Sequence, residues 1–110
     1  MAVLYGSTRG NGEKITASMA ILKGLAEDGG LFVPDSIPAL DVPLKELLGK
    51  SYQEIAYQVM SRLLTDFTEE ELRNCINKAY DSKFDAPEIA PLVKKGNSYY
   101  LELFHGSIIA

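Results

Sequence analysis

The sequence contains no tryptophan, one cysteine and one histidine in 110 residues. A lone cysteine cannot form a disulfide within the chain, and residues 1–6 contain neither a charged leader nor an apolar run of signal-peptide length. No stretch approaches the roughly 18 consecutive apolar residues that a membrane span needs. From these absences we expect a soluble, cytoplasmic protein with no membrane partner.

Basic residues are also scarce. The chain has 11 lysines and arginines against 15 acidic residues, which gives a net charge of −4, and only Lys94 and Lys95 are adjacent. A nucleic-acid-binding surface needs a basic patch that neutralises phosphates, so we expect no nucleic-acid partner. No cluster of metal ligands is predicted, because the acidic run at residues 69–71 is better explained by the start of a helix than by a metal site.

Two capping boxes predict a pair of long helices. In Ser51–Glu54 and Thr68–Glu71 a hydroxyl and a carboxylate can satisfy backbone amides that the first helical turn leaves unpaired. The first helix begins at Tyr52 and is expected to be the main core helix, with an apolar stripe of Ile55, Ala56, Val59, Met60, Leu63 and Leu64. The second has an inner face of Leu72, Cys75, Ile76, Ala79 and Tyr80. We expect an antiparallel pair in which Cys75 is a small buried hydrophobe rather than a nucleophile.

Two shorter helices are predicted as well. Thr16 can cap a helix that stops at residues 27–30, and Pro43 suits the first turn of another. Residues 86–93 contain two prolines and are expected to be irregular. Apolar runs predict short extended segments at 2–5 and 31–33 and a mostly buried strand at 99–104. The predicted fold class is a predominantly helical α+β domain with about four helices and a few short strands.

Residues 6–12 form a predicted loop with three glycines. A phosphate-binding P-loop needs lysine and then serine or threonine after its last glycine, whereas Gly12 is followed by Glu13. We therefore interpret this loop as a flexible turn, in which Arg9 either structures the loop or faces an anion.

The end of the sequence contains the residues best placed for chemistry. His105, Gly106 and Ser107 follow a predicted strand and supply the only imidazole, a permissive glycine and a hydroxyl in consecutive positions. Strand ends are where α/β enzymes bind ligands. We expect these three residues to line an active site, and the alternative is a histidine with a purely structural role. No residue of the chain is predicted to be catalytic, to bind a cofactor or to bind a metal.

Three segments resemble the threonine synthases, a family of pyridoxal 5′-phosphate (PLP) enzymes of fold type II, related to the tryptophan synthase β subunit. Residues 7–10 read Ser-Thr-Arg-Gly, residues 22–34 read LKGLAEDGGLFVP where the family has LKGLAPDGGLFVP, and residues 101–106 read LELFHG. Together they span nearly the whole chain. The resemblance implies a parent protein that converts O-phospho-L-homoserine and water to L-threonine and phosphate.

The resemblance also implies how the chain divides. In the family the lysine that binds PLP follows the LELFHG run closely, so it would lie just past Ala110, and Ile108 stands where the family usually has threonine. Residues 1–97 are expected to be the N-terminal helical domain, and residues 98–110 the first strand and turn of an α/β PLP-binding domain. We expect the chain alone to be catalytically inactive and free of cofactor. We also expect it to pack against its own C-terminal catalytic domain.

Two other interpretations are open at this point. One is a free-standing helical protein-interaction module without catalysis, which would offer a hydrophobic groove. The other is that the final strand pairs through its free edge with a second copy of the chain.

Overall fold

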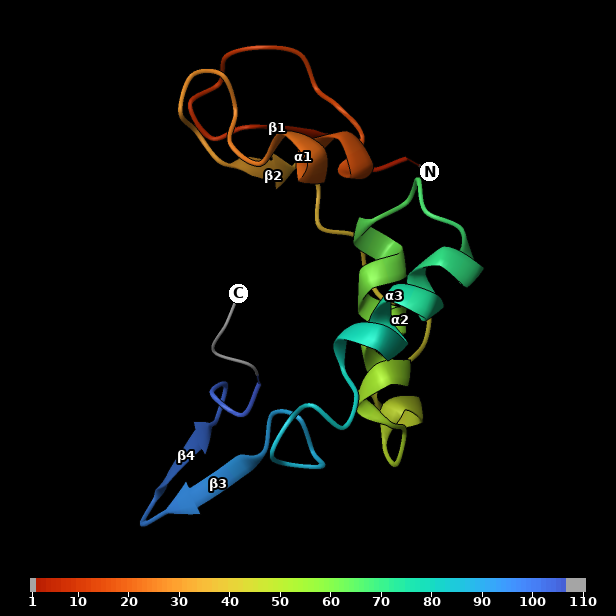
Figure 1. The fold of residues 1–110 in the computed structure, drawn as a ribbon, viewed down its shortest axis with the longest axis vertical. Helices are drawn as coiled ribbons and strands as arrows, with labels where there is room; N and C mark the ends of the chain where they lie inside the picture. Colours follow the sequence, from red (N-terminus) through yellow and green to blue (C-terminus); the bar gives the residue numbers. More distant parts are fainter. Residues whose placement is uncertain (1, 107–110) are drawn as a thin grey trace.

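The structure is a computed structural model that describes residues 2–106. Its elements, in chain order, are β1 (Tyr5–Ser7), α1 (Ala17–Lys23), β2 (Phe32–Pro34), the 3-10 helix η1 (Leu44–Leu47), α2 (Tyr52–Leu63), α3 (Glu69–Ala79), β3 (Leu92–Lys95) and β4 (Ser98–Leu101). Figure 1 shows three parts: an N-terminal unit of β1, α1 and β2, a helical hairpin of α2 and α3, and a β-hairpin of β3 and β4.

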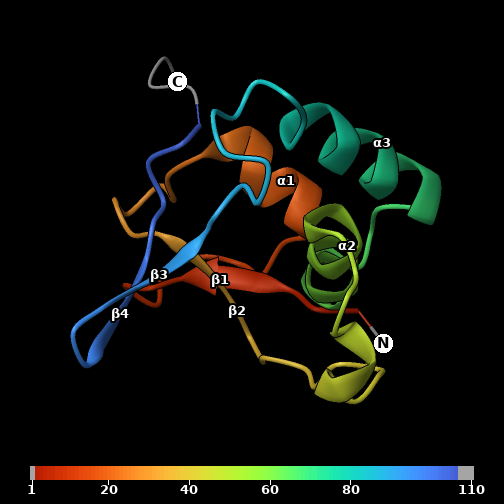
Figure 2. The ribbon, with the colours of Figure 1, turned by 90° about the horizontal axis from the view of Figure 1, so that it is seen from below.

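The N-terminal unit is built on a two-stranded antiparallel sheet, in which Tyr5 lies opposite Pro34 and Ser7 opposite Phe32. Helix α1 lies beside this sheet (Figure 2). The Thr16 hydroxyl caps it by accepting a hydrogen bond from the backbone N–H of Met19, as predicted. The predicted end at residues 27–30 is wrong, because Gly24 adopts a φ of +77° and ends α1 at Lys23.

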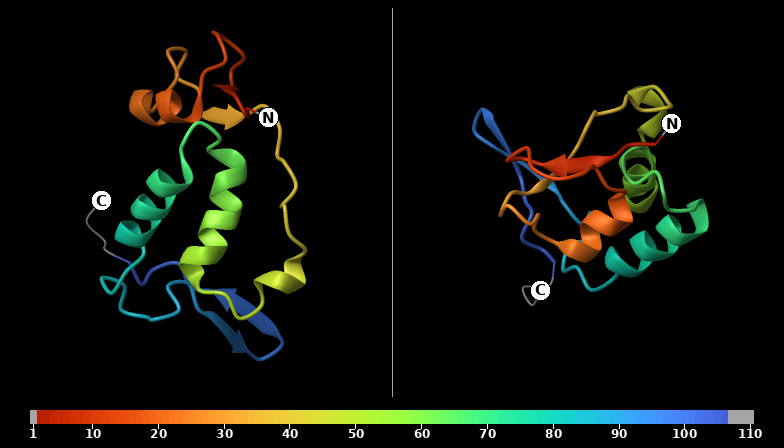
Figure 3. Two further views of the ribbon diagram at one scale, coloured as in Figure 1. Left: turned by 90° about the vertical axis from the view of Figure 1, so that its right-hand side faces the viewer. Right: turned by 90° about the horizontal axis from the view of Figure 1, so that it is seen from above.

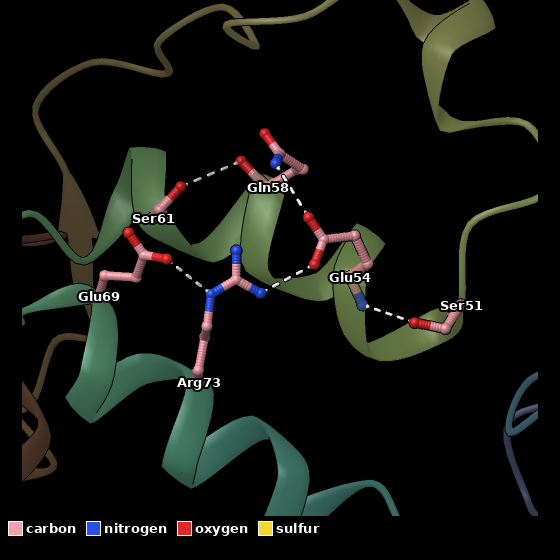
Figure 4. Close-up of polar contacts among 6 residues, drawn as sticks. All are labelled: Ser51, Glu54, Gln58, Ser61, Glu69 and Arg73. Carbon is pink, nitrogen blue, oxygen red and sulfur yellow. Dashed lines mark hydrogen bonds and ion pairs between the residues drawn. The ribbon is translucent and has the colours of Figure 1, made fainter.

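The helical hairpin confirms the capping box at Thr68 in full, but at Ser51 it confirms only the hydroxyl cap, because the Glu54 carboxylate bonds Arg73 and Gln58 instead of the Ser51 backbone. Ser51 Oγ accepts from the Glu54 N–H at 3.1 Å, and Thr68 and Glu71 form a complete capping box. Arg73 of α3 fastens the two helices, since it donates to Glu54 of α2 at 2.8 Å and to Glu69 at 2.9 Å (Figure 4). The hydrogen bond from Arg73 is also the main reason why the pKa of Glu54 lies below its ordinary value.

The buried core is small. Among the described residues it consists of Val3, Ala17, Ala20, Ala26, Leu72, Ile76, Ala86 and Ile89. Helix α2 contributes none of these, so the prediction that it is the main core helix is wrong. Helix α3 buries only Leu72 and Ile76, and Cys75, which was expected to be buried, is exposed. Most residues of α2 are half-buried rather than buried, because a two-helix hairpin covers only one face of each helix.

The fold is α+β, but the prediction of four helices is wrong. The described residues contain three α-helices and four strands, arranged as two separate two-stranded sheets. The fourth predicted helix is the single 3-10 turn η1. Leu44 and Leu48 are both exposed, so no packing supports a longer helix there.

The β-hairpin corrects two further predictions. Leu92, expected in an irregular segment, pairs with Leu101 in the antiparallel β3–β4 ladder. The strand predicted to be mostly buried is exposed throughout β4, and Leu103 and Phe104 beyond it are 76% and 68% exposed. An apolar run of this length does not reveal by itself whether another layer covers it.

Hydrogen bonds join the N-terminal unit to the tip of the helical hairpin (Figure 3). The Tyr5 hydroxyl donates to the Leu63 carbonyl at 2.8 Å, the Val3 N–H donates to Thr65 Oγ1 at 2.9 Å, and Ser18 bonds Asp66. Within residues 2–106, no helix has the length and hydropathy needed to cross a membrane.

Candidate functional site

The residues of the two N-terminal motifs, 7–10 and 22–34, meet in one cluster around Asp28. Its carboxylate accepts hydrogen bonds from Ser7 Oγ at 2.6 Å, from the Gly30 N–H at 2.9 Å and from the Asn11 N–H at 3.2 Å. These bonds, with that of Ser7 the strongest influence, hold the pKa of Asp28 below its ordinary value. The carboxylate therefore stays ionised and ties the two segments together.

Gly29 and Gly30 allow this close approach. A Cβ atom at Gly30 would overlap Ser7 Oγ and would lie 3.0 Å from Thr8 Oγ1 and from Asp28 Oδ1. Gly29 has a φ of +83°, which side-chain-bearing residues rarely adopt. The turn at residues 28–30 is thus restricted to glycine by space at one position and by backbone conformation at the other.

Arg9 structures this loop. Its guanidinium Nη1 donates to the Asp28 carbonyl at 2.8 Å, and Thr8 Oγ1 accepts from the Leu31 N–H at 3.0 Å. Of the two interpretations left open for Arg9, the structural one matches this geometry. A pocket of about 330 Å³ lies beside the cluster, and its lining includes Asn11, Glu13, Lys23, Glu27, Asp28 and Phe32. Its lining carries three carboxylates and one ammonium, and Lys23 pairs with Glu27 at 3.4 Å, so the pocket offers no free cation to an anionic ligand.

His105 lies at the centre of a second cluster. Its Nε2 is 2.8 Å from Glu102 Oε1, and its Nδ1 contacts Asp85 Oδ1. These hydrogen bonds raise the pKa of His105 above its ordinary value, and the bond to Glu102 has a larger effect than the bond to Asp85. Desolvation of the ring acts in the opposite direction and lowers the pKa. The ring is 17% exposed. This cluster lies near the β-hairpin, whereas the Asp28 cluster lies in the N-terminal unit, so the motifs form two sites rather than one (Figure 1).

Backbone contacts position the histidine. The Asp85 N–H donates to the His105 carbonyl at 3.0 Å. Gly106 packs against Phe84 so closely that a Cβ atom on it would lie 2.8 Å from Phe84 Cε2. Of the three predicted lining residues, His105 and Gly106 are thus side by side against one turn. Ser107 lies outside the described residues, as does Ile108.

The sequence interpretation missed three residues that shape these clusters: Asp28, Asp85 and Glu102. Asp28 lies inside a recognised motif, and an aspartate two residues before a glycine could have suggested an Asx-type turn. Asp85 is 20 residues from its partner His105. No spacing rule connects residues so far apart, so only the folded chain identifies that contact.

Neither cluster is arranged as a metal site. Glu102 and Asp85 contact different nitrogens of the His105 ring, so their oxygens do not converge on one point. Within residues 2–106, no group of three or more histidine, cysteine, aspartate or glutamate side chains could hold a metal ion.

Comparison with known proteins finds relatives that carry the name threonine synthase or threonine synthase-like. The family described as "Threonine synthase N terminus" matches residues 4–80. The threonine synthase of Schizosaccharomyces pombe is 41% identical over 98% of this chain, which corresponds to 22% of that protein. The human protein named "Threonine synthase-like 1" is 39% identical over 86% of this chain and 14% of its own length.

Solved structures that resemble this chain are threonine synthases as well. The crystal structure of PLP-bound threonine synthase from Brucella melitensis superposes with a TM-score of 0.84 at 35% identity, over 96% of this chain and 23% of that one. Yeast threonine synthase gives a TM-score of 0.74 at 34% identity, over 94% of this chain and 22% of that one. The chain thus spans less than a quarter of these relatives. With a family match over most of its length, the chain belongs to the threonine synthase N-terminal domain family.

Proposed function

We propose that this chain is the N-terminal domain of a threonine synthase that converts O-phospho-L-homoserine and water to L-threonine and phosphate with PLP. The observation that carries the proposal is the match of residues 4–80 to the family's N-terminal domain. When bound, PLP supplies an electron sink that stabilises negative charge next to the substrate amine. A cytoplasmic location is part of the proposal and is supported by the single cysteine, which can form no disulfide within the chain.

The residues of this chain do not themselves fit the cofactor. PLP is held as an imine on a lysine, and such lysines are activated by desolvation or by a neighbouring cation. All eight lysines here are exposed, and several are occupied by acidic partners, as Lys83 is by Asp81 at 2.8 Å. In this proposal the cofactor is therefore bound by the remainder of a longer protein, and this chain supports that remainder.

The exposed apolar surface supports a role in packing against a larger body. Leu22, Leu25, Leu31, Leu101, Leu103 and Phe104 are all exposed. Covering such side chains gains about 25 cal/mol per Å² of apolar surface. We place the boundary at residue 97, so that residues 98–110 begin the catalytic domain. His105, Gly106 and Ser107 then lie where they can line its active site.

A domain exchange tests the proposal. The corresponding N-terminal region of the S. pombe threonine synthase is replaced by this chain, and phosphate release from O-phospho-L-homoserine is measured. We expect the chimera to be active, and the S. pombe protein lacking this region to be inactive. A chimera that folds and binds PLP but releases no phosphate would contradict the proposal.

The isolated chain is the matched control. With PLP added, we expect no imine absorbance, no product trapped by borohydride and no phosphate release. A trapped PLP adduct together with turnover by the 110-residue chain would contradict the assignment of the cofactor site to the remainder of the protein.

A further inference from the structure

The contacts of His105 indicate its protonation state. A carboxylate oxygen only accepts hydrogen bonds, and a neutral imidazole has one N–H donor, whereas the imidazolium has two. Both ring nitrogens of His105 contact a carboxylate: Nε2 contacts Glu102 at 2.8 Å, and Nδ1 contacts Asp85. A neutral ring would turn a lone pair toward one of these oxygens, so both contacts are favourable only when the ring carries both protons.

The two carboxylates come from different segments. Glu102 lies just after β4, on the segment of His105 itself, while Asp85 lies on the connection between α3 and β3. That connection also carries Asp81, Lys83 and Glu88. Asp81 and Lys83 pair with each other at 2.8 Å, and Glu88 is exposed. Two aromatic rings also lie close to the junction: the Phe104 ring centroid is 4.5 Å from that of His105, and Phe84 packs against Gly106.

We propose that His105 is a pH-dependent clamp, whose protonated ring binds Glu102 and Asp85 together and so fixes residues 102–106 against the turn at residues 81–85. The backbone bond from the Asp85 N–H to the His105 carbonyl, at 3.0 Å, belongs to the same junction. His105 is in this role a positioning residue rather than a free base. The inference does not depend on the proposed function.

The direction of the pH dependence follows from the hydrogen bonds. They raise the pKa of His105 in the folded chain above the ordinary value of 6.5. A raised pKa contributes stability that is complete below about 6.5 and is lost as pH rises through the folded-state pKa. The clamp therefore holds below pH 6.5 and releases as the pH rises through the folded-state pKa of His105.

Proton NMR can test the clamp directly, because the 110-residue chain has a single histidine and hence a single imidazole titration. We expect a midpoint above 6.5 that falls toward 6.5 in Glu102→Gln. Asp85→Asn should lower it less, since the Asp85 side chain is 75% exposed and that of Glu102 only 26%. The matched control is Asp81→Asn, which removes a carboxylate from the same turn and should leave the midpoint in place.

Amide hydrogen exchange tests the positioning role. Relative to its intrinsic rate, the Asp85 amide should lose protection as pH passes the His105 midpoint, and in His105→Gln it should be unprotected at every pH. The α3 amides report whether each variant is folded. A wild-type midpoint at or below 6.5, a midpoint unchanged in both carboxylate variants, or Asp85 protection that does not follow the midpoint would each overturn the proposal.

Discussion

Two glycines of this chain are surrounded so closely that any larger residue would force a neighbouring group to move. Gly30 lies against Ser7, Thr8 and Asp28, and Gly106 lies against the Phe84 ring. In both cases a missing side chain lets two distant segments touch. At Gly30 the neighbours are groups of a hydrogen-bonded cluster, so a Cβ atom would have to displace Ser7 from Asp28.

Replacement of Gly30 by alanine should therefore destabilise the fold. We expect Gly30→Ala to lower the free energy of unfolding by about 1–3 kcal/mol, the usual cost of overpacking a filled site. Urea denaturation measures the change. Gly6→Ala is the matched control, because the nearest atom to its new Cβ would be Lys14 Cγ at an ordinary 3.7 Å. Equal losses in both variants would contradict the assigned role of Gly30.

Asp28 should make stability depend on pH at the acidic end. Its pKa is lowered in the folded chain from the ordinary 3.8, so its contribution is present above about 3.8 and is lost as pH falls through the folded-state pKa. We expect Asp28→Asn to lower the melting temperature at pH 6 and to narrow its difference from wild type toward pH 3. Thermal unfolding followed by circular dichroism checks this, with Glu13→Gln as the exposed control. A difference in melting temperature that stays constant between pH 6 and pH 3 would argue against the ionised Asp28 carboxylate as the group that holds the two segments together.

At the scale of elements, the helix starts are local devices. Thr16, Ser51 and Thr68 each accept a hydrogen bond from the N–H three residues later. Such a bond closes within one turn and needs no tertiary partner. This is why the capping hydroxyls predicted all three starts correctly. The buried faces of the helices were predicted less well, because the burial of a side chain depends on which other segment packs against that face.

The Thr68 cap supports a quantitative prediction. Thr68→Ala removes the acceptor for the Glu71 N–H at 3.1 Å and should lower the free energy of unfolding by about 1 kcal/mol. Thr68→Ser keeps a hydroxyl at the same position and should cost at most a few tenths of a kcal/mol. Chemical denaturation of both variants measures the difference, and an alanine variant as stable as wild type would show that the capping bond contributes nothing.

The whole molecule is open for its size. Its radius of gyration is 16.3 Å, against about 13 Å for a compact domain of this length. Its accessible surface is 8208 Å², against about 6,000 Å² for a folded monomer of this mass. Figure 1 shows the N-terminal unit and the β-hairpin extending from opposite ends of the helical hairpin, an arrangement that increases both values. Such a shape fits a part of a larger body.

An exposed leucine beyond β4 tests that interpretation. Leu103 is 76% exposed, so in the 110-residue chain Leu103→Ser should change stability by no more than about 0.5 kcal/mol. In the chimeric full-length enzyme, where we propose that Leu103 is covered, the same change should cost about 2 kcal/mol. Denaturation of both proteins compares the two values. An equal effect in the two settings would mean that the larger body does not cover this residue.

The sequence by itself determined the family, the three helix starts and the α+β character, because each rests on contiguous motifs or on hydrogen bonds between residues a few positions apart. Only the tertiary structure decided that α2 buries no residue, that Cys75 faces solvent and that Leu92 pairs with Leu101. It alone also brought Asp85 to His105 across 20 residues. The physical reason is that burial and long-range pairing depend on the path of the chain through space, and the spacing of residues along the sequence does not reveal that path.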